Sequence, residues 1–290
     1  MVSTPHFDRL RRDFQFTEMD FQEIRELIYA YAGISLSNTK KAMVYSRVGR
    51  RLRINGFTRF CDYLTFLKSG DKAEWQAFVN ALTTNLTSFF REKHHFPLLA
   101  EHVRSIRDGQ SINLWCCASS TGEEPYTMAM TMVDVFGSYN PPVHILATDV
   151  DTQVLKTAAA GIYPIERVES LSPDVLRRFF LKGTGSNAGT VRVRQELRNM
   201  ISFQPLNLHD QSWPVQGPFD AVFCRNVMIY FDKPTQRKIL QKIVPFMRRD
   251  ALFFAGHSES FHHAEDLLSL RGSTVYNVAD EVLHLGVPGR

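Results

Sequence analysis

Residues Ser111–Tyr126 read SINLWCCASSTGEEPY, and this stretch decides the fold. The apolar run Ile112–Cys117 predicts a buried strand, the small polar residues before Gly122 predict a loop, and the following residues predict a helix. A strand, a glycine-bearing loop and a helix N-terminus in this order form the nucleotide site of open α/β sheets. A helix N-terminus normally attracts anions, yet Glu123 and Glu124 occupy this one. We therefore expect a nucleoside ligand that carries a positive group rather than a pyrophosphate.

Strand-like and helical runs alternate along the rest of the chain, which predicts a mostly parallel sheet covered by helices on both faces. The glycine-rich segment Leu181–Arg194 departs from this alternation, because its second half alternates apolar and charged residues and so predicts a β-hairpin. The expected strands are 112–117, 143–148, 201–206, 219–224 and 251–255, and the expected helices are 123–135, 152–160 and 234–247.

The first part of the chain, from about residue 17 to residue 83, has apolar residues at helical spacing and predicts four helices. Thr17 and Asp20 are spaced like a capping box at the start of the first helix. Between Leu27 and Cys61 the chain has seven Lys or Arg and no Asp or Glu, although the formal net charge of the whole chain is only +4. This asymmetry indicates a basic docking face on the second helix, about 38–54.

The four cysteines have no spacing typical of a metal site, and three of them lie in apolar runs, where a free thiol behaves as a small buried hydrophobe. Adjacent His94 and His95 do not share one face of a helix. We therefore expect no metal site and no structural disulfide, as is typical of a protein in the reducing cytoplasm.

Asp149 ends the second expected strand, where an acid commonly binds ribose hydroxyls in doubly wound folds. The loop before Glu123 lacks the G-x-G-x-x-G pattern of a tight pyrophosphate turn. Polar Arg225 and Asn226 end a further strand at the same edge of the sheet. These features fit a dinucleotide or S-adenosylmethionine, and the acidic helix start favours S-adenosylmethionine because its methionine end carries an ammonium group.

From about Met19 to Tyr276 the chain resembles the chemotaxis receptor methyltransferases of the CheR family. Four motifs carry the resemblance: ALTTNLTSFFRE at 81–92, ASSTGEEPY at 118–126, FCRNVMIYF at 223–231 and FAGHSE at 254–259. The resemblance implies a helical N-terminal domain over 1–84, a linker and first helix over 85–110, and a Rossmann-like class I methyltransferase domain over 111–290. A small antiparallel β-subdomain is expected as an insertion at about 181–200.

The resemblance also implies roles for individual residues. Arg91 and Tyr230 are expected near the reacting groups, Glu124 at the methionine end of the cofactor and Asp149 at its ribose, whereas Glu123 is expected mainly to stabilise its helix. The cofactor-binding set implied by the family is Asn85, Thr87, Arg91, Glu124, Asp149, Asn207, Leu208, Arg225 and Asn226.

The chemistry implied by the family is methyl transfer from S-adenosylmethionine to glutamate side chains of methyl-accepting chemoreceptors, with S-adenosylhomocysteine as product. A glutamate carboxylate is already ionised at neutral pH, so the reaction needs orientation rather than a general base. The partner is then the cytoplasmic domain of a membrane receptor, and we expect a cytoplasmic monomer that is recruited to receptor arrays, without membrane insertion or nucleic-acid binding.

Two surfaces are candidates for receptor recognition. The basic helix presents Arg47, Arg50, Arg51 and Arg53, which could dock an acidic receptor helix, although a charged helix face is most often simply solvated. In some family members a glycine-bearing hairpin binds a pentapeptide at the receptor's C-terminus by strand addition. The matching residues here are Lys182, Gly183, Gly185, Gly189 and Arg192, with lysine at 182 where some pentapeptide binders have arginine.

Three alternatives remain open on the sequence. The chain could be a binding module of the same fold that senses receptors or nucleotides without turnover, a nicotinamide-dependent dehydrogenase, or a nucleic-acid methyltransferase. The acidic helix start disfavours the dehydrogenase. The basic helix lacks interleaved aromatic residues, which disfavours the nucleic-acid enzyme.

Overall fold

The computed structural model describes residues 14–106 and 111–280. Within them the chain divides into two compact units, a helical unit of residues up to 30 and 36–82, and a catalytic unit of residues 31–35 and 83 onward. Each unit is described by itself. None of the helices in the described ranges is long and apolar enough to cross a membrane.

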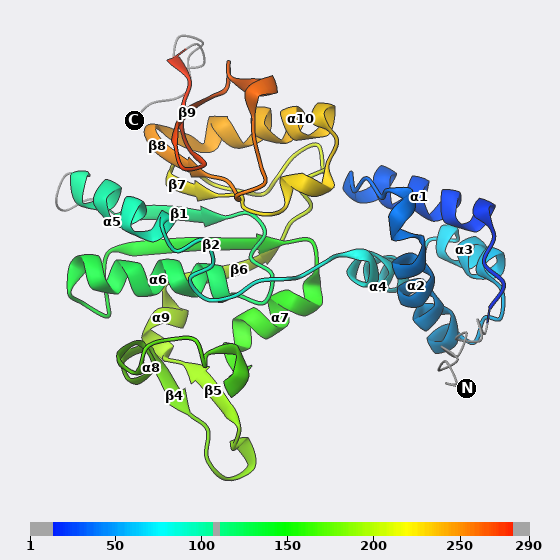
Figure 1. The fold of residues 1–290 in the computed structure, drawn as a ribbon, viewed down its shortest axis with the longest axis horizontal. Helices are drawn as coiled ribbons and strands as arrows, with labels where there is room; N and C mark the ends of the chain where they lie inside the picture. Colours follow the sequence, from blue (N-terminus) through cyan, green and yellow to red (C-terminus); the bar gives the residue numbers. More distant parts are fainter. Residues whose placement is uncertain (1–13, 107–110, 281–290) are drawn as a thin grey trace, which may run out of the picture. The chain divides into compact units, whose positions relative to one another are not determined.

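The helical unit consists of α1, α2, α3 and α4, as the spacing of its apolar residues predicts (Figure 1). The capping box is confirmed, because the Thr17 amide donates to Asp20 at 2.8 Å and the Asp20 amide donates to the Thr17 hydroxyl at 3.1 Å. Val44, Val48 and Leu52 line the buried face of α2. The bounds are α1 Glu18–Ala32, α2 Lys41–Asn55, α3 Phe60–Lys68 and α4 Lys72–Leu82, with a 3-10 turn, η1, at Asn38–Lys40.

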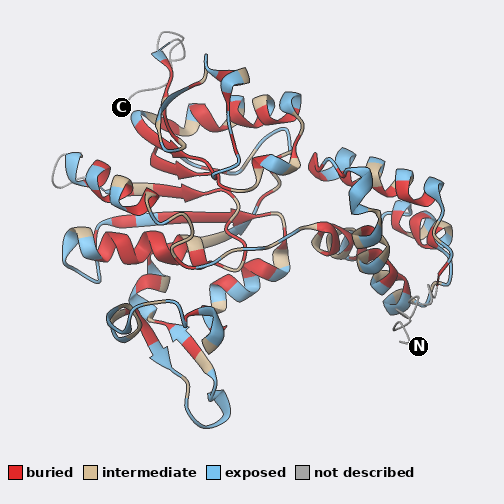
Figure 2. Ribbon diagram, in the orientation of Figure 1, coloured by how far each residue is buried: buried red, intermediate tan, exposed pale blue. Residues whose placement is uncertain are grey.

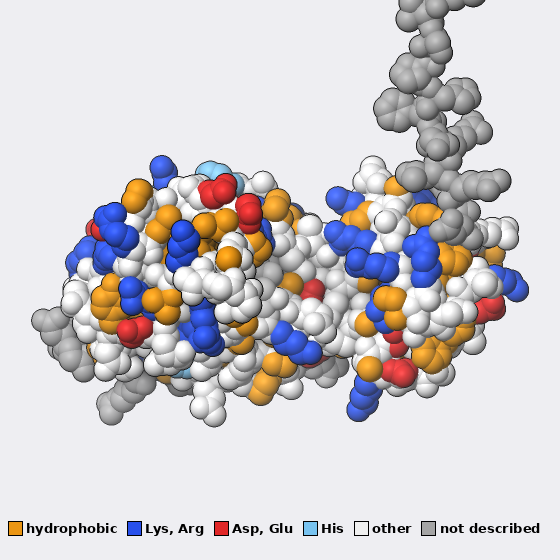
Figure 3. Space-filling view, turned by 90° about the horizontal axis from the view of Figure 1, so that it is seen from below, with side chains coloured by type: hydrophobic (Ala, Val, Ile, Leu, Met, Phe, Trp, Pro, Cys, Tyr) orange, Lys and Arg blue, Asp and Glu red, His pale blue; other side chains and the backbone are white. Residues whose placement is uncertain are grey.

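The arginines of α2 have different surroundings. Arg51 is half-buried, and its guanidinium pairs with the buried carboxylate of Glu74, which also accepts a hydrogen bond from the Tyr63 hydroxyl at 2.7 Å. Arg47 donates to the Ala81 carbonyl, and the Arg53 guanidinium lies over the Phe14 ring. Arg50 is exposed. Figure 3 shows Lys and Arg side chains gathered on this unit, but the Arg51 charge is balanced internally.

The catalytic unit is built on a seven-stranded sheet in the order β6-β2-β1-β7-β8-β10-β9. Its first five strands are parallel, and β10 runs antiparallel to both β8 and β9. The predicted parallel α/β sheet is therefore confirmed, while β9 and β10 are additional to the prediction. The strand bounds are β1 Ile112–Cys116, β2 Val143–Asp149, β6 Ile201–Pro205, β7 Phe219–Phe223, β8 Met247–Phe254, β9 Leu268–Gly272 and β10 Val275–Val278.

Successive residues of β1 serve two different cores, which is why this strand reads as a continuous apolar run. Ile112, Leu114 and Cys116 belong to one cluster with residues of α5 and α6. Trp115 lies between them in sequence and packs against Trp213 and Phe246 instead. Figure 2 shows the resulting buried sheet and the buried α6 beside it. The helix bounds are α5 His95–Ser105, α6 Glu123–Phe136, α7 Thr152–Ala160 and α10 Lys233–Ile243.

The β-subdomain is a separate three-stranded antiparallel sheet in the order β3-β5-β4. The expected hairpin is present as β4 and β5, but the sheet begins earlier than the predicted 181–200, because β3 pairs with the other edge of β5. A strand of three residues is too short for a periodicity argument to detect. The bounds are β3 Ile162–Pro164, α8 Pro173–Phe179, β4 Phe180–Lys182, β5 Thr190–Val193 and α9 Gln195–Asn199.

Candidate functional site

The candidate site lies at the carboxyl ends of β2, β1 and β7, which are adjacent strands of the sheet. The chain crosses from β1 to β2 on one side and returns to β7 on the other, so the strand order reverses at β1. Ligands of open α/β sheets bind at such a point. Asp149 ends β2, the loop 117–122 follows β1, and Arg225 comes two residues after β7.

Asp149 is a buried carboxylate that fixes two loops. One oxygen accepts the Ser120 amide at 2.8 Å and the other accepts the Asp151 amide at 2.9 Å. Burial raises the pKa of Asp149 to about 6, although these backbone hydrogen bonds act in the opposite direction. Each oxygen of an ionised carboxylate can accept more than one hydrogen bond. Asp149 therefore retains acceptor capacity for ribose hydroxyls.

Asp151, to which the sequence analysis gave no role, connects the segment after the helical unit to this edge of the sheet. One of its oxygens caps α7 by accepting the Gln153 amide, and the other accepts the Thr83 hydroxyl at 3.0 Å and the Asn85 amide group at 2.9 Å. The Ser120 hydroxyl donates to the Asn85 carbonyl at 3.3 Å. Asn85, predicted as a cofactor contact, thus lies beside the β1 loop, and its side chain is held by Asp151.

The centre of the site is the guanidinium of Arg225, whose side chain is completely buried. It pairs with Glu124 at 2.8 Å and with Glu92 at 3.2 Å, and it donates to the Arg91 carbonyl at 2.5 Å. Asn226 donates its side-chain amide to Glu92 at 3.1 Å. These contacts bring together the segment before α5, the start of α6 and the end of β7. The guanidinium of Arg225, which was predicted as a cofactor contact, is held by these protein groups.

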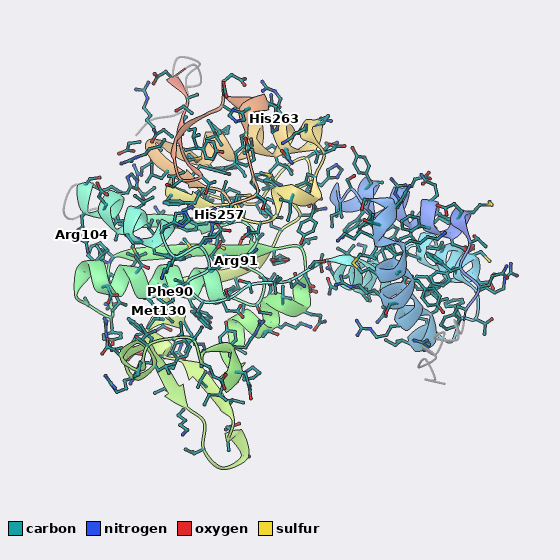
Figure 4. All side chains as sticks on the ribbon, viewed as in Figure 1. Phe90, Arg91, Arg104, Met130, His257 and His263 are labelled. Atoms are coloured by element: carbon teal, nitrogen blue, oxygen red, sulfur yellow. The ribbon has the colours of Figure 1, made fainter. Side chains whose placement is uncertain are left out.

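Glu92 is the second residue that the sequence analysis left without a role. Burial alone would raise the pKa of Glu92, but the hydrogen bond from Asn226 and the charge of Arg225 lower it below its usual value. Its other hydrogen-bond donor is the backbone amide of His257, in the turn after β8. Figure 4 labels Arg91 and His257, which lie on the two segments that Glu92 connects.

Glu124 differs from Glu92, because burial raises its pKa above the usual value and the charge of Arg225 only partly offsets this effect. Its second oxygen accepts a hydrogen bond from the Cys116 thiol at 3.2 Å, and a thiol is a weak donor. Two carboxylates therefore share one buried guanidinium, so the cluster of Glu92, Glu124 and Arg225 has one negative charge in excess. This donor set fits the ammonium group at the methionine end of S-adenosylmethionine.

Glu123 and Gly122 have partners outside the cluster of Glu92, Glu124 and Arg225. Glu123 is fully buried, pairs with Arg167 at 3.2 Å and accepts the Thr121 hydroxyl at 2.6 Å. Gly122 has a φ of +100°, and a Cβ there would lie 2.8 Å from the Ala158 Cβ. The glycine of the loop is therefore required by helix packing against α7, and of the two adjacent acids only Glu124 belongs to the Arg225 cluster.

The remaining predicted residues occupy the same edge with different neighbours. Leu208 is buried, and the Asn207 side chain donates to the Tyr31 carbonyl at 2.7 Å. This loop is joined to the end of β2, because the Leu206 amide donates to the Asp149 carbonyl. Thr87 lies on the segment between Asn85 and Arg91, and its carbonyl accepts Arg167.

Backbone strain concentrates at this site. Six non-glycine residues in the described part of the chain have positive φ, and four of them lie at the candidate site. L-residues adopt such values at a cost that persists only where the surrounding structure imposes it. Here the contacts that hold the backbone in these conformations are those of Arg225, Glu92 and Asp149. The four residues are Phe90, Glu92, Ser120 and Asn226.

Comparison with known proteins gives two family matches that together cover most of the chain. Residues 85–277 match the CheR methyltransferase SAM binding domain, and residues 19–83 match the CheR methyltransferase all-alpha domain. The chain belongs to the CheR methyltransferase family. It is an S-adenosylmethionine-dependent methyltransferase that acts in chemotaxis, and the S-adenosylmethionine expected from the sequence is its cofactor.

Curated relatives of the CheR family are similar over nearly their whole length. The chain is 50% identical over 279 residues to chemotaxis protein methyltransferase 2 of Pseudomonas aeruginosa, covering 96% of this chain and 99% of that one. It is 52% identical over 266 residues to the chemotaxis protein methyltransferase of Escherichia coli, covering 91% and 92% of the two chains.

Substitution of the two adjacent glutamates separates cofactor binding from helix stability. Glu124→Gln removes the carboxylate that we expect to face the ammonium group, and loss of one charge-assisted contact predicts an affinity for S-adenosylhomocysteine about 10- to 100-fold weaker. Glu123→Gln is the matched control, which we expect to lower the unfolding midpoint with affinity within about twofold. Calorimetry and thermal unfolding measure the two effects. Equal affinities for both variants would contradict the assignment.

Asp149 predicts a pH dependence of cofactor binding. Its pKa is raised to about 6, so the carboxylate is ionised only above that pH, and the ionised form is the better acceptor for ribose hydroxyls. We expect the affinity for S-adenosylhomocysteine to rise between about pH 5 and about pH 7. Asp149→Asn should bind more weakly and lack this part of the dependence. An identical pH profile in Asp149→Asn, measured by calorimetry, would exclude the role.

Proposed function

We propose that this protein methylates glutamate side chains of methyl-accepting chemoreceptors, producing glutamate methyl esters and S-adenosylhomocysteine for chemotactic adaptation. When bound, S-adenosylmethionine supplies an electrophilic methyl group on its sulfonium. The observation that carries the proposal is a half-exposed cation, Arg91, whose backbone carbonyl binds the same Arg225 guanidinium that pairs with Glu124. A group able to hold a carboxylate therefore lies beside the residues that we assign to the cofactor.

Arg91 is held by two hydrogen bonds, one made by its side chain and one by its own backbone carbonyl. Its guanidinium donates to the Leu86 carbonyl at 2.7 Å, and its own carbonyl accepts Arg225. A guanidinium has five donors, so the remaining ones can bind a carboxylate in a bidentate manner. Since the substrate carboxylate is already ionised, orientation by Arg91 is the main contribution that the reaction requires.

Tyr230 is the second residue that we assign to the reacting groups. It ends a 3-10 turn, η4, over Met228–Tyr230, four residues after Asn226, and its ring is half-exposed. No hydrogen bond of its hydroxyl is present within the described residues. The hydroxyl is thus available for a substrate oxygen, and the ring can exclude water from the methyl group.

Receptor docking is assigned to the basic helix α2, supported by the exposure of Arg50 and Arg53 and the half-exposure of Arg47. An acidic, glutamate-bearing helix is the complementary partner. Arg51 contributes to the fold through Glu74, so its part in docking is the least supported by the structure.

The β-subdomain is assigned to the C-terminal pentapeptide of a receptor. Strand β4 is at the edge of its sheet, where strand addition occurs. Arg192 pairs in register with Leu181, whereas Lys182 pairs with Val191, so Arg192 and Lys182 project from opposite faces. Arg192 is therefore the better candidate for an acidic side chain. Gly183 keeps the loop tight, because a Cβ there would lie 2.0 Å from the Asn187 carbonyl oxygen, while Gly185 and Gly189 have positive φ.

The test of catalysis is transfer of labelled methyl groups from S-adenosylmethionine to receptor-bearing membranes, with base-labile label as the sign of esters. Arg91→Ala should lower kcat about 100-fold or more, because a misplaced carboxylate loses the oriented approach. Arg104→Ala, an exposed arginine of α5, is the control. Full turnover by Arg91→Ala would exclude its role, and cofactor binding without transfer by the wild type would favour a silent binding module.

Charge reversal tests the docking surface. Arg50→Glu should raise the KM for the receptor several-fold, since it places like charge opposite an acidic helix, and should leave the affinity for S-adenosylhomocysteine unchanged. The effect should diminish at high salt. Arg104→Glu provides the same charge change away from α2. If both variants raise KM equally, the basic helix is not the docking surface.

Calorimetry with an aromatic–acidic C-terminal pentapeptide tests the β-subdomain. We expect micromolar binding that Arg192→Ala weakens about tenfold, a loss typical of one charge-assisted contact, while Lys182→Ala has a smaller effect. The absence of heat at several hundred micromolar peptide, on the order of the concentrations that detect weak binding, would exclude the tether.

A further inference from the structure

Glu259 is a buried carboxylate in the turn after β8, only 5% exposed. It accepts three backbone amides in the described structure: Asn226 at 2.9 Å and Gly256 at 2.5 Å on one oxygen, and Met228 at 2.8 Å on the other. A carboxylate is the only side chain of this size that accepts at both oxygens without donating. Glu259 therefore fastens the segment after β7 to the turn after β8.

The segment that Glu259 holds connects Arg225, just after the end of β7, with Tyr230. It begins after Arg225, passes through Asn226 with a φ of +58°, and ends with the turn η4, whose last residue is Tyr230. The contact with the turn after β8 is close, because a Cβ on Gly256 would lie 2.3 Å from the Asn226 side-chain nitrogen. The position of Asn226 thus depends on this junction.

A second buried side chain holds the other end of η4. Gln236 of α10 donates its amide group to the Met228 carbonyl at 2.8 Å and to the Phe231 carbonyl at 3.0 Å. A single 3-10 turn has few hydrogen bonds of its own, so external partners determine where it lies. Glu259 binds amides of this segment, and Gln236 binds its carbonyls.

We propose that Glu259 is a positioning residue of the methyl transfer reaction, which holds η4 so that Tyr230 faces the reacting groups. This inference rests on the proposed role of Tyr230. Burial raises the pKa of Glu259, so an ionised carboxylate here is costly for stability. Three converging amides of a short segment explain why a carboxylate occupies the position, and Gln236 supports the same turn from α10.

The experiment is a double-mutant cycle on the full-length enzyme. Glu259→Gln, Tyr230→Phe and the double variant are compared for kcat, for the KM of S-adenosylmethionine and for the unfolding midpoint. We expect Glu259→Gln to lower kcat about tenfold with the KM for S-adenosylmethionine within about twofold. In the Tyr230→Phe background the same substitution should lower kcat less than about twofold further, because the two residues act as one unit.

The matched control is Asp220→Asn. Asp220 is a carboxylate of similar burial near the start of β7, where it accepts the Asn113 amide at 2.7 Å and pairs with Arg248 at 2.8 Å, at the opposite edge of the sheet. This substitution should lower the unfolding midpoint but leave kcat unchanged. A comparable loss of kcat in Asp220→Asn would show that the kcat loss of Glu259→Gln comes from lower protein stability, and it would overturn the proposal.

The other outcomes are also distinguishable. Suppose that Tyr230→Phe lowers kcat and that the double variant loses kcat by the product of the two single losses. The positioning role of Glu259 is then wrong, while the role of Tyr230 stands. If Tyr230→Phe retains full kcat, the role of Tyr230 fails and the inference fails with it. Should Glu259→Gln not fold, Gln236→Met takes its place in the cycle, since it releases the same turn through its carbonyls, with the same outcomes deciding.

Discussion

The buried guanidinium of Arg225 is the constraint on which the site depends. Its partners come from three separate parts of the chain: Glu92 and the Arg91 carbonyl before α5, and Glu124 at the start of α6. Removal of this cation would leave two carboxylates in a poorly solvated region, where unpaired charge is strongly destabilising. The same cation also sets the balance of charge, because it neutralises only one of the two acids. One interaction thus joins three separate parts of the chain at the site.

Much of this arrangement could be predicted from local sequence. The strand, loop and acidic helix around Glu124, and the acid that ends β2, follow from patterns within a few residues, and their meeting at one edge follows from parallel topology. Glu92 could not be assigned a role in this way, because its partner Asn226 is 134 positions away. Asp151 and Arg51 reflect the same limit, since each is explained by a partner on a different element.

The short strand β3 shows a different limit, that of pattern length. Three residues, of which only Tyr163 is buried, do not establish a period of two. The hairpin β4–β5 was detectable because glycines and alternating residues extend over more than ten positions. A short strand that forms only because a neighbouring strand supplies its backbone hydrogen-bond partners has no sequence signal of its own. The boundaries of the β-subdomain were therefore predicted too narrowly.

The assignment of residues 31–35 to the catalytic unit has a consequence for how the chain can be divided. The chain passes between the units three times. This short segment, which includes the last two residues of α1, provides the Tyr31 carbonyl that Asn207 binds and the Ser35 amide that donates to the Tyr230 carbonyl at 2.8 Å. A fragment that begins at Thr83 would keep Asn85, Arg91 and Glu92 but lose both of these contacts. The catalytic unit is discontinuous in sequence. The helical unit therefore cannot be removed, or exchanged between relatives, at a single peptide bond without loss of the hydrogen bonds that residues 31–35 make to Asn207 and Tyr230.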